Sequence, residues 1–175
     1  VMRESWERGS IYAAFMGETN YVGHGQIDSG AFVYYNNGTK WFMDIGTEDY
    51  NATGFGYGTQ TIQKNQTYSS GDTMYYTNTA EGNNCLVSVD TANTPFGQKW
   101  GKNVGASGQI KAPDASTPPY ASNSNGGYAI LDQTSVYNAS YAYRGMLFTN
   151  GRRTVVIQDE ITYKSSTASY WVGHL

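Results

Sequence analysis

The stretch "AFVYYNNGTKWFMDIG", Ala31–Gly46, places two apolar and aromatic runs on either side of Asn36-Asn37-Gly38. Asn-Gly is a strong hairpin signal, because both residues accept the left-handed backbone angles of a tight two-residue turn. A second pair, Asn150-Gly151, separates "RGMLF" from "TVVIQDEI". Both stretches therefore predict antiparallel strand pairs joined by hairpin turns.

Further strand-like runs continue the pattern along the chain. They are "TMYYTNTA" (73–80), "NCLVSVDT" (84–91), "YAILDQTSVY" (128–137) and "ASYWVGHL" (168–175). One helix candidate, "SWERGSIYAAFMGE" (5–18), fits a strand equally well, and residues 101–127 suggest one long Ser/Asn/Pro/Gly insertion. We expect a single all-β domain over residues 1–175, an antiparallel, supersandwich-like β-sandwich with hairpins and long loops. Its helix content should stay below about a fifth, against about a third in an average protein.

The composition of the 175 residues narrows the functional classes. Charged residues make up 14%, against about 25% in an ordinary soluble domain, and the chain contains 16 Tyr and 21 Gly. A net charge of −3 without a basic run argues against a nucleic-acid partner. No apolar run approaches the roughly twenty residues needed to span a bilayer. The single cysteine, Cys85, excludes an internal disulfide, and its strand-like neighbours predict a buried thiol.

Four N-x-S/T sequons suggest an extracellular protein. The candidate glycosylation sites are Asn37, Asn51, Asn65 and Asn138. The hydroxyl-rich and amide-rich composition agrees with secretion. The chain begins abruptly at "VMRESW", which is typical of a cut-out or mature piece rather than a natural start.

Seven motifs then appear in a specific order. They are "RESW" (3–6), "HGQIDSGAF" (24–32), "WFMDIG" (41–46), "AEGNNCLVSV" (80–89), "LDQTSVY" (131–137), "GRRTVVIQDEI" (151–161) and "YWVGHL" (170–175). Their order and spacing resemble the β-sandwich domain of the heparinase II/III-like polysaccharide lyases, a family related to alginate lyases and dermatan sulfate epimerases. The resemblance spans essentially the whole chain. Family members usually carry an α/α-toroid domain before the sandwich, so we expect this chain to be a fragment whose toroid is absent.

The resemblance implies β-elimination at a uronic acid of an acidic polysaccharide. A base removes the proton at C5, an acid protonates the departing oxygen at C4, and the substrate carboxylate is neutralised meanwhile. His24 matches the family's catalytic histidine, and its flanking glycines leave room for a substrate. Taken without the family, a lone histidine is more often structural.

The family's zinc ligands are altered in this chain. They correspond to Gln26, Asp44 and Asn83, so two of the three are amides. Zinc prefers nitrogen and sulfur ligands, and a calcium ion on these oxygens would lack charge to hold it. The sequence therefore predicts no cofactor and a hydrogen-bond network around Asp44 in place of the metal.

Other residues have a functional and a structural interpretation. Asp28 and Asp44 could form a glycosidase carboxylate pair, but a carboxylate after a loop or at a strand end more often caps backbone amides or orients His24. Arg3 and Trp6 could bind a sugar carboxylate and stack on a pyranose ring, or equally close the sandwich edge. We expect structural roles for the remaining candidates, namely His174 in its terminal strand and a solvated or turn-capping strand end for Asp159 and Glu160.

Two functions follow from the sequence. The first is the sandwich half of a secreted polysaccharide lyase or epimerase, weak or inactive alone, in which His24 is catalytic and Arg3, Trp6, Gln26, Asp28, Asp44 and Asn83 contact substrate. The second is a non-catalytic carbohydrate-binding or structural module derived from the same fold, which the loss of zinc ligands favours. We expect His24, Gln26, Asp44 and Asn83 to share one concave, partly solvent-open patch, and a His24 far from Asp44 and Asn83 would leave only the second function. Its aromatic lining should be Trp6, Tyr21 and Tyr50, with the "GFGYG" loop (54–58) at its border.

The altered ligand set leads to a first prediction. Metal analysis of the purified protein should find no tightly held zinc, because one carboxylate and two amides bind zinc weakly. One zinc per chain that disappears in an Asp44→Ala variant would contradict this interpretation of Gln26 and Asn83.

Overall fold

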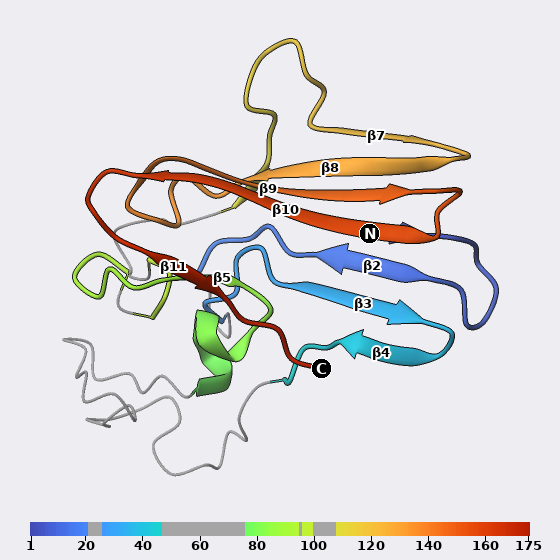
Figure 1. Cartoon of the computed structure of the whole chain (residues 1–175), viewed down its shortest axis with the longest axis horizontal. Coiled ribbons are helices and arrows are strands. Elements are labelled where there is room, and N and C mark those ends of the chain that lie inside the picture. The colour runs from blue at the N-terminus through green and yellow to red at the C-terminus, as the bar shows by residue number, and fades with distance from the viewer. Residues whose placement is uncertain (21–25, 47–75, 95, 100–107) are drawn as a thin grey trace.

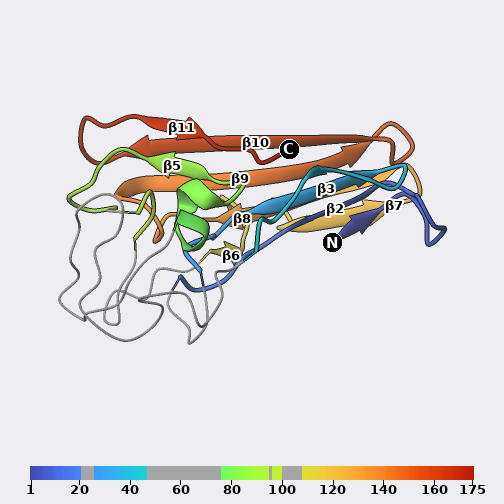
Figure 2. The same cartoon turned by 90° about the horizontal axis from the view of Figure 1, so that it is seen from below.

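The computed structural model describes residues 1–20, 26–46, 76–94, 96–99 and 108–175. Within these ranges every regular strand pairing is antiparallel, and three sheets of four, five and two strands pack together (Figures 1 and 2). The only helical elements in the described ranges are two single 3-10 turns, η1 (Tyr76–Asn78) and η2 (Ala80–Gly82). The expected all-β sandwich is therefore confirmed.

The first sheet has the order β1-β2-β3-β4. Its strands are β1 (Met2–Arg3), β2 (Tyr12–Phe15), β3 (Phe32–Asn36) and β4 (Thr39–Phe42). The turn between β3 and β4 has positive φ at Asn37 (51°) and Gly38 (80°), which confirms the first predicted hairpin. Within the helix candidate, residues 12–15 form strand β2.

The second sheet has the order β10-β9-β8-β6, and β7 also pairs with β8. Its strands are β6 (Gln109–Ile110), β7 (Tyr120–Asn123), β8 (Gly126–Asp132), β9 (Ala139–Thr149) and β10 (Thr154–Tyr163). The second predicted hairpin is confirmed by the turn between β9 and β10, where Asn150 and Gly151 have φ of 56° and 63°. A small sheet pairs β5 (Leu86–Ser88) with β11 (Ser169–Trp171).

Two expectations of secondary structure were wrong. Residues 76–80 were expected in a strand but lie in the two 3-10 turns, because Thr79 donates its backbone N–H and its hydroxyl to the Tyr76 carbonyl. The segment 101–127 was expected to be one long insertion, yet its described part contains β6 and β7. All four residues of β7 are exposed, so the strand has no buried face and leaves no alternating pattern in the sequence.

The core between the two larger sheets consists of side chains that alternate with outward-facing ones. Ala13, Phe32 and Met146 are buried at its centre. Around them pack Met2, Phe15, Tyr34, Phe42, Val155 and Ile157. A second cluster surrounds Cys85, which is fully buried as predicted, and burial raises the pKa of its thiol to about 12. In the described residues, no helix has the length and apolar character needed to cross a membrane.

A buried ion pair crosses this core. Arg144 on β9 is fully buried and forms two hydrogen bonds with Asp159 on β10, at 2.7 and 2.8 Å. The same guanidinium donates to the carbonyls of Gly30 (2.6 Å) and Asn84 (3.1 Å) and lies 4.7 Å from the Trp171 ring centroid. The sequence prediction of a solvated strand end is thus wrong for Asp159, which is largely buried, and fits the exposed Glu160.

Substitution of Arg144 by Met should lower the free energy of unfolding by about 3–5 kcal/mol, because Asp159 would stay buried without its cation. Urea unfolding of the two proteins measures the difference. The matched control is Arg153→Met, which removes a guanidinium that is 73% exposed and lies 3.6 Å from Glu4. The control should change stability by less than about 1 kcal/mol. Equal losses of unfolding free energy in the two variants would show that burial of the Arg144–Asp159 pair does not contribute to the effect.

Candidate functional site

The turn that follows His24 in sequence is held firmly at its backbone. Ile27 donates its N–H to Asn78 O (2.8 Å), Gly30 to Met16 O (2.7 Å) and Ala31 to Asp28 O (2.7 Å). Gly30 has φ of 81° and so needs a residue without a side chain. The turn is thus connected to β2, to η1 and to itself.

Buried side chains hold the same turn from the core side. Ser29 O accepts hydrogen bonds from Gln98 Nε2 (2.8 Å) and Gln133 Nε2 (2.7 Å), while Gly30 O accepts from Arg144. Asn20 Oδ1 accepts from the Ser29 N–H at 3.2 Å. Gln98, Gln133 and Asn20 are all buried to within 2% exposure. The turn is therefore preorganised by the nearby Asn20 and by side chains from three distant parts of the chain.

Asp28 lies on this turn and is only 4% exposed. Burial, the neighbouring carboxylates of Glu18 and Asp44, and a hydrogen bond with Glu18 raise the pKa of Asp28 to about 7; its own backbone N–H acts in the opposite direction. Its Oδ1 atom is buried without a hydrogen-bond partner. A carboxyl group with a pKa of about 7 exchanges a proton near neutral pH.

Asp44 and Asn83 come together at one hollow, as the sequence led us to expect. This hollow has a volume of about 260 Å³, and its lining also includes Asn84 and residues of β2 and β3. Asp44 is exposed, and its Oδ1 accepts the Gly46 N–H at 2.7 Å, which is a turn-capping role. Asn83 is buried and donates to Thr77 O (3.2 Å) and Thr79 O (2.9 Å). Gln26, which the structure describes, is not one of the residues that line this hollow.

These side chains do not fit the zinc that the family resemblance would imply. The Asn83 amide nitrogen is committed to two carbonyls of the η1–η2 segment, and Asp44 caps its own turn. The part of the chain that the structure describes contains no group of three His, Cys, Asp or Glu placed to hold a metal ion. Gln26 Oε1 is buried without a hydrogen-bond partner, and a single amide oxygen is a poor zinc ligand.

Arg3 and Trp6 lie together in a different hollow. The Arg3 guanidinium carbon is 4.4 Å from the Trp6 ring centroid, and Trp6 is 86% exposed. Their groove has a volume of about 860 Å³, and its lining also includes Gly17 and residues of β7 and β8. The exposed ring of Tyr120 and the side chain of Arg152 also line it. Trp6 thus faces this groove rather than the hollow of Asp44 and Asn83.

Several predicted residues lie outside the described ranges. They are His24, Tyr21, Tyr50, the "GFGYG" loop, Asn51 and Asn65. Of the other two sequons, Asn37 is exposed in the β3–β4 turn, whereas Asn138 Nδ2 already donates to Asp90 and Ser165. His174 is held between the Glu81 carbonyl and the Tyr76 ring, which agrees with a structural role.

Comparisons with models of protein families and with curated proteins found no match to this chain.

The buried Asp28 carboxyl leads to a prediction on stability. Its folded-state pKa of about 7 lies above the ordinary 3.8, so the folded protein binds this proton more tightly than the unfolded chain. The resulting stability is fully present below about pH 4 and is lost as pH rises through about 7, by a few kcal/mol at most. Urea unfolding between pH 4 and 8 should show this fall in the wild type, and Asp28→Asn should largely remove it.

The matched control is Glu160→Gln, which deletes the same charge from an exposed strand position. The control should keep the wild-type pH dependence. An Asp28→Asn protein with an unchanged pH profile would mean that Asp28 titrates normally.

Proposed function

We propose that this chain is the β-sandwich domain of an extracellular polysaccharide lyase or epimerase that acts on uronic acid residues of an acidic polysaccharide. The observation that carries the proposal is the anchored turn at Gln26–Ala31, immediately after His24. A catalytic group needs a rigid support to keep its geometry, and four buried side chains, those of Asn20, Gln98, Gln133 and Arg144, form hydrogen bonds to this one turn.

In the proposed reaction His24 takes the proton from C5 of the uronate. The electrons of that C–H bond form the C4=C5 double bond, the C4–O bond breaks, and the departing oxygen takes a proton from an acid. By the family resemblance that acid is a tyrosine of the toroid domain, a partner that this chain would need. An epimerase returns the C5 proton to the opposite face instead of breaking the C4–O bond.

Asp28 supports the proposal through its pKa of about 7. A carboxyl group that is half protonated near neutral pH can keep or release a proton. It lies four residues after His24 on the same anchored turn. We assign Asp28 a positioning role toward the site, with Asp44 and Asn83 forming the wall of the nearby hollow.

A second function is favoured by a separate observation. The groove of Arg3 and Trp6 combines an open aromatic ring with a cation, which suits a sugar ring and its carboxylate without any chemistry. The Asp44 carboxylate and the Asn83 amide instead form hydrogen bonds with nearby backbone groups. A non-catalytic carbohydrate-binding module would need nothing more than this groove.

The protein expressed at its full coding length should separate these two functions. It is incubated with alginate, polygalacturonate and chondroitin sulfate, and the unsaturated uronate product is followed by its ultraviolet absorbance. A lyase gives rising absorbance on at least one polymer, and His24→Ala abolishes it by removing the base. The matched control is His174→Gln, which preserves a hydrogen bond to Glu81 O and should retain activity.

An epimerase would show no absorbance change but would incorporate deuterium from heavy water at C5. Binding of a polymer without absorbance or deuterium incorporation would establish the binding module. Equal activity of His24→Ala and wild type would overturn the catalytic proposal.

A further inference from the structure

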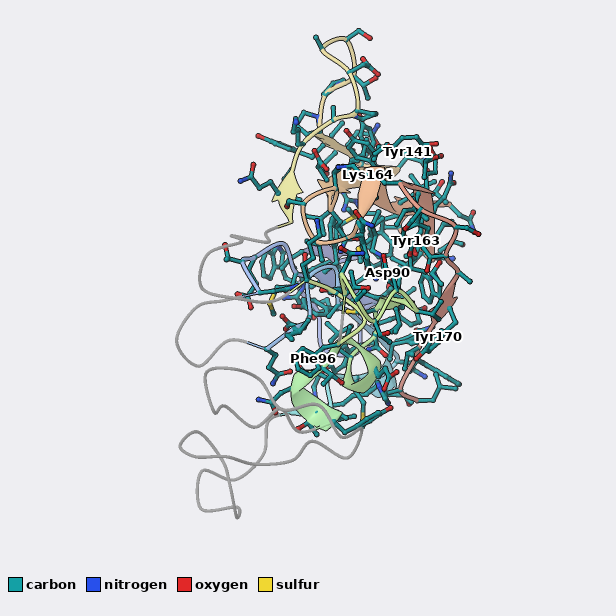
Figure 3. All side chains as sticks on the ribbon, turned by 90° about the vertical axis from the view of Figure 1, so that its left-hand side faces the viewer. Asp90, Phe96, Tyr141, Tyr163, Lys164 and Tyr170 are labelled. Atoms are coloured by element: carbon teal, nitrogen blue, oxygen red, sulfur yellow. The ribbon has the colours of Figure 1, made fainter. Side chains whose placement is uncertain are left out.

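Three of the six lysines line one hollow at the end of the β8–β9–β10 sheet. Lys99 follows Gln98, Lys111 follows β6, and Lys164 follows β10, so three separate segments bring them together. The hollow has a volume of about 600 Å³. The chain has a net charge of −3, so this positively charged hollow is opposite in sign to the protein as a whole. Lys164 and Tyr141 lie at the same end of the molecule in Figure 3.

The charges in this hollow are incompletely balanced. Lys111 lies 3.3 Å from the Asp132 carboxylate, which accounts for one cation. The pKa of Lys99 is lowered mainly by partial burial and, to a smaller extent, by repulsion from Lys164. Asp90 acts in the opposite direction. An anion placed between Lys99 and Lys164 would relieve that repulsion. The lining also offers hydroxyl groups, on Thr134, Ser140 and Tyr143.

An open trough adjoins the lysines on the outward face of the sheet. Tyr143 lines both hollows, and the trough continues over Gly145 to Leu147 and Val156, with a volume of about 250 Å³. Gly145 has no side chain, so the trough is open above its backbone. A Cβ added there would contact only the Gln158 carbonyl, at 4.0 Å. Leu147 and Val156 are 41% and 42% exposed. Gln158 and Glu160 add polar groups to this lining. An apolar floor with an aromatic edge and polar groups beside it suits the face and the hydroxyl groups of a sugar ring.

We propose that the lysine hollow binds a carboxylate or sulfate group of an acidic polysaccharide, with the neighbouring sugar ring lying against Tyr143 in the Gly145 trough. This site is separate from the turn after His24 and from the Arg3–Trp6 groove. It shares its ligand class with the proposed function, but it does not depend on catalysis. Its role is to hold the polymer to the domain by charge complementarity.

The test measures the affinity of the full-length protein for chondroitin sulfate and for polygalacturonate by calorimetry at low salt. The variant Lys99→Gln/Lys164→Gln removes the two lysines that Asp132 does not pair. Its affinity should fall about tenfold, as expected for the loss of two partly exposed charge contacts. The matched control is Arg8→Gln/Lys40→Gln, which removes the same charge from exposed positions elsewhere and should change affinity less than about twofold. Equal losses in both double variants would overturn the site, because net charge alone would then explain binding.

The two polymers separate the possible anions. Chondroitin sulfate carries sulfate and carboxylate groups, whereas polygalacturonate carries carboxylates alone, so a loss confined to the first identifies sulfate as the ligand. Tyr143→Ala should weaken both polymers but leave polyglutamate, a peptide of similar charge density, unaffected. Polyglutamate that binds as tightly as the polysaccharides, with no effect of Tyr143→Ala, would overturn the assignment to a sugar.

Chemical labelling tests the same site without any substitution. An amine-reactive ester should modify Lys99 and Lys164 less in the presence of polysaccharide, and Lys40 to the same extent with and without it. Unprotected Lys99 and Lys164 at saturating polymer would contradict the proposal. The lysine double variant should still form the unsaturated product at saturating polymer, whereas His24→Ala should not, so failure of this site and failure of the proposed function are distinguishable.

Discussion

The ion pair between Arg144 and Asp159 sets the positions of three separate parts of the chain. It joins β9 to β10, and the same guanidinium reaches the carbonyls of Gly30 and Asn84. A fully buried cation is tolerated only when its donors find partners, so each of these carbonyls is an obligatory contact. The sheet of β8–β10 and the turn after His24 are thus fixed relative to each other by one side chain. Trp171 covers the pair from β11 and also donates to Asp159.

This arrangement connects the stability of the core with the geometry of the candidate site. The turn that Arg144 holds carries Asp28, whose carboxyl is buried without a full set of hydrogen bonds. A buried carboxyl with an unpartnered oxygen costs stability, and the network of Gln98, Gln133 and Asn20 around Ser29 offsets that cost. Functional sites often contain an ionisable group whose pKa is shifted by burial, held in place by a rigid hydrogen-bond network.

The sequence predicted those parts of the fold that depend on neighbouring residues. The Asn-Gly pairs at 37–38 and 150–151 specify turns through their own backbone angles, and the apolar runs on either side of them form the paired strands β3–β4 and β9–β10. The sequence-based prediction missed β7, because that strand has no buried face. It was also wrong for residues 76–80, where tyrosine and threonine favour a strand but hydrogen bonds from Thr79 close a turn. Local propensity was overridden there by side-chain bonds.

The candidate site was predictable only in part. Asp44 and Asn83 share a hollow as expected, but Gln26 does not line it, and Trp6 lies with Arg3 in a separate groove. The partners of Arg144 and Ser29 could not be inferred, because Gly30 lies 114 residues from Arg144 and Gln133 lies 104 residues from Ser29. Amides such as Gln98 and Gln133 have no motif, and their burial follows from the three-dimensional packing alone. The same reason explains why Asp159 was expected in solvent.

The register of the β9–β10 hairpin has a consequence for the order of folding. Arg144 and Asp159 stand directly opposite each other on the two strands. Hairpins of this kind form within about 1–10 μs, earlier than contacts between residues far apart in sequence. The guanidinium can therefore meet its carboxylate while both are still hydrated, and the carbonyls of Gly30 and Asn84 arrive when the sheets dock. The register thus allows this charge to be neutralised before the core closes around it.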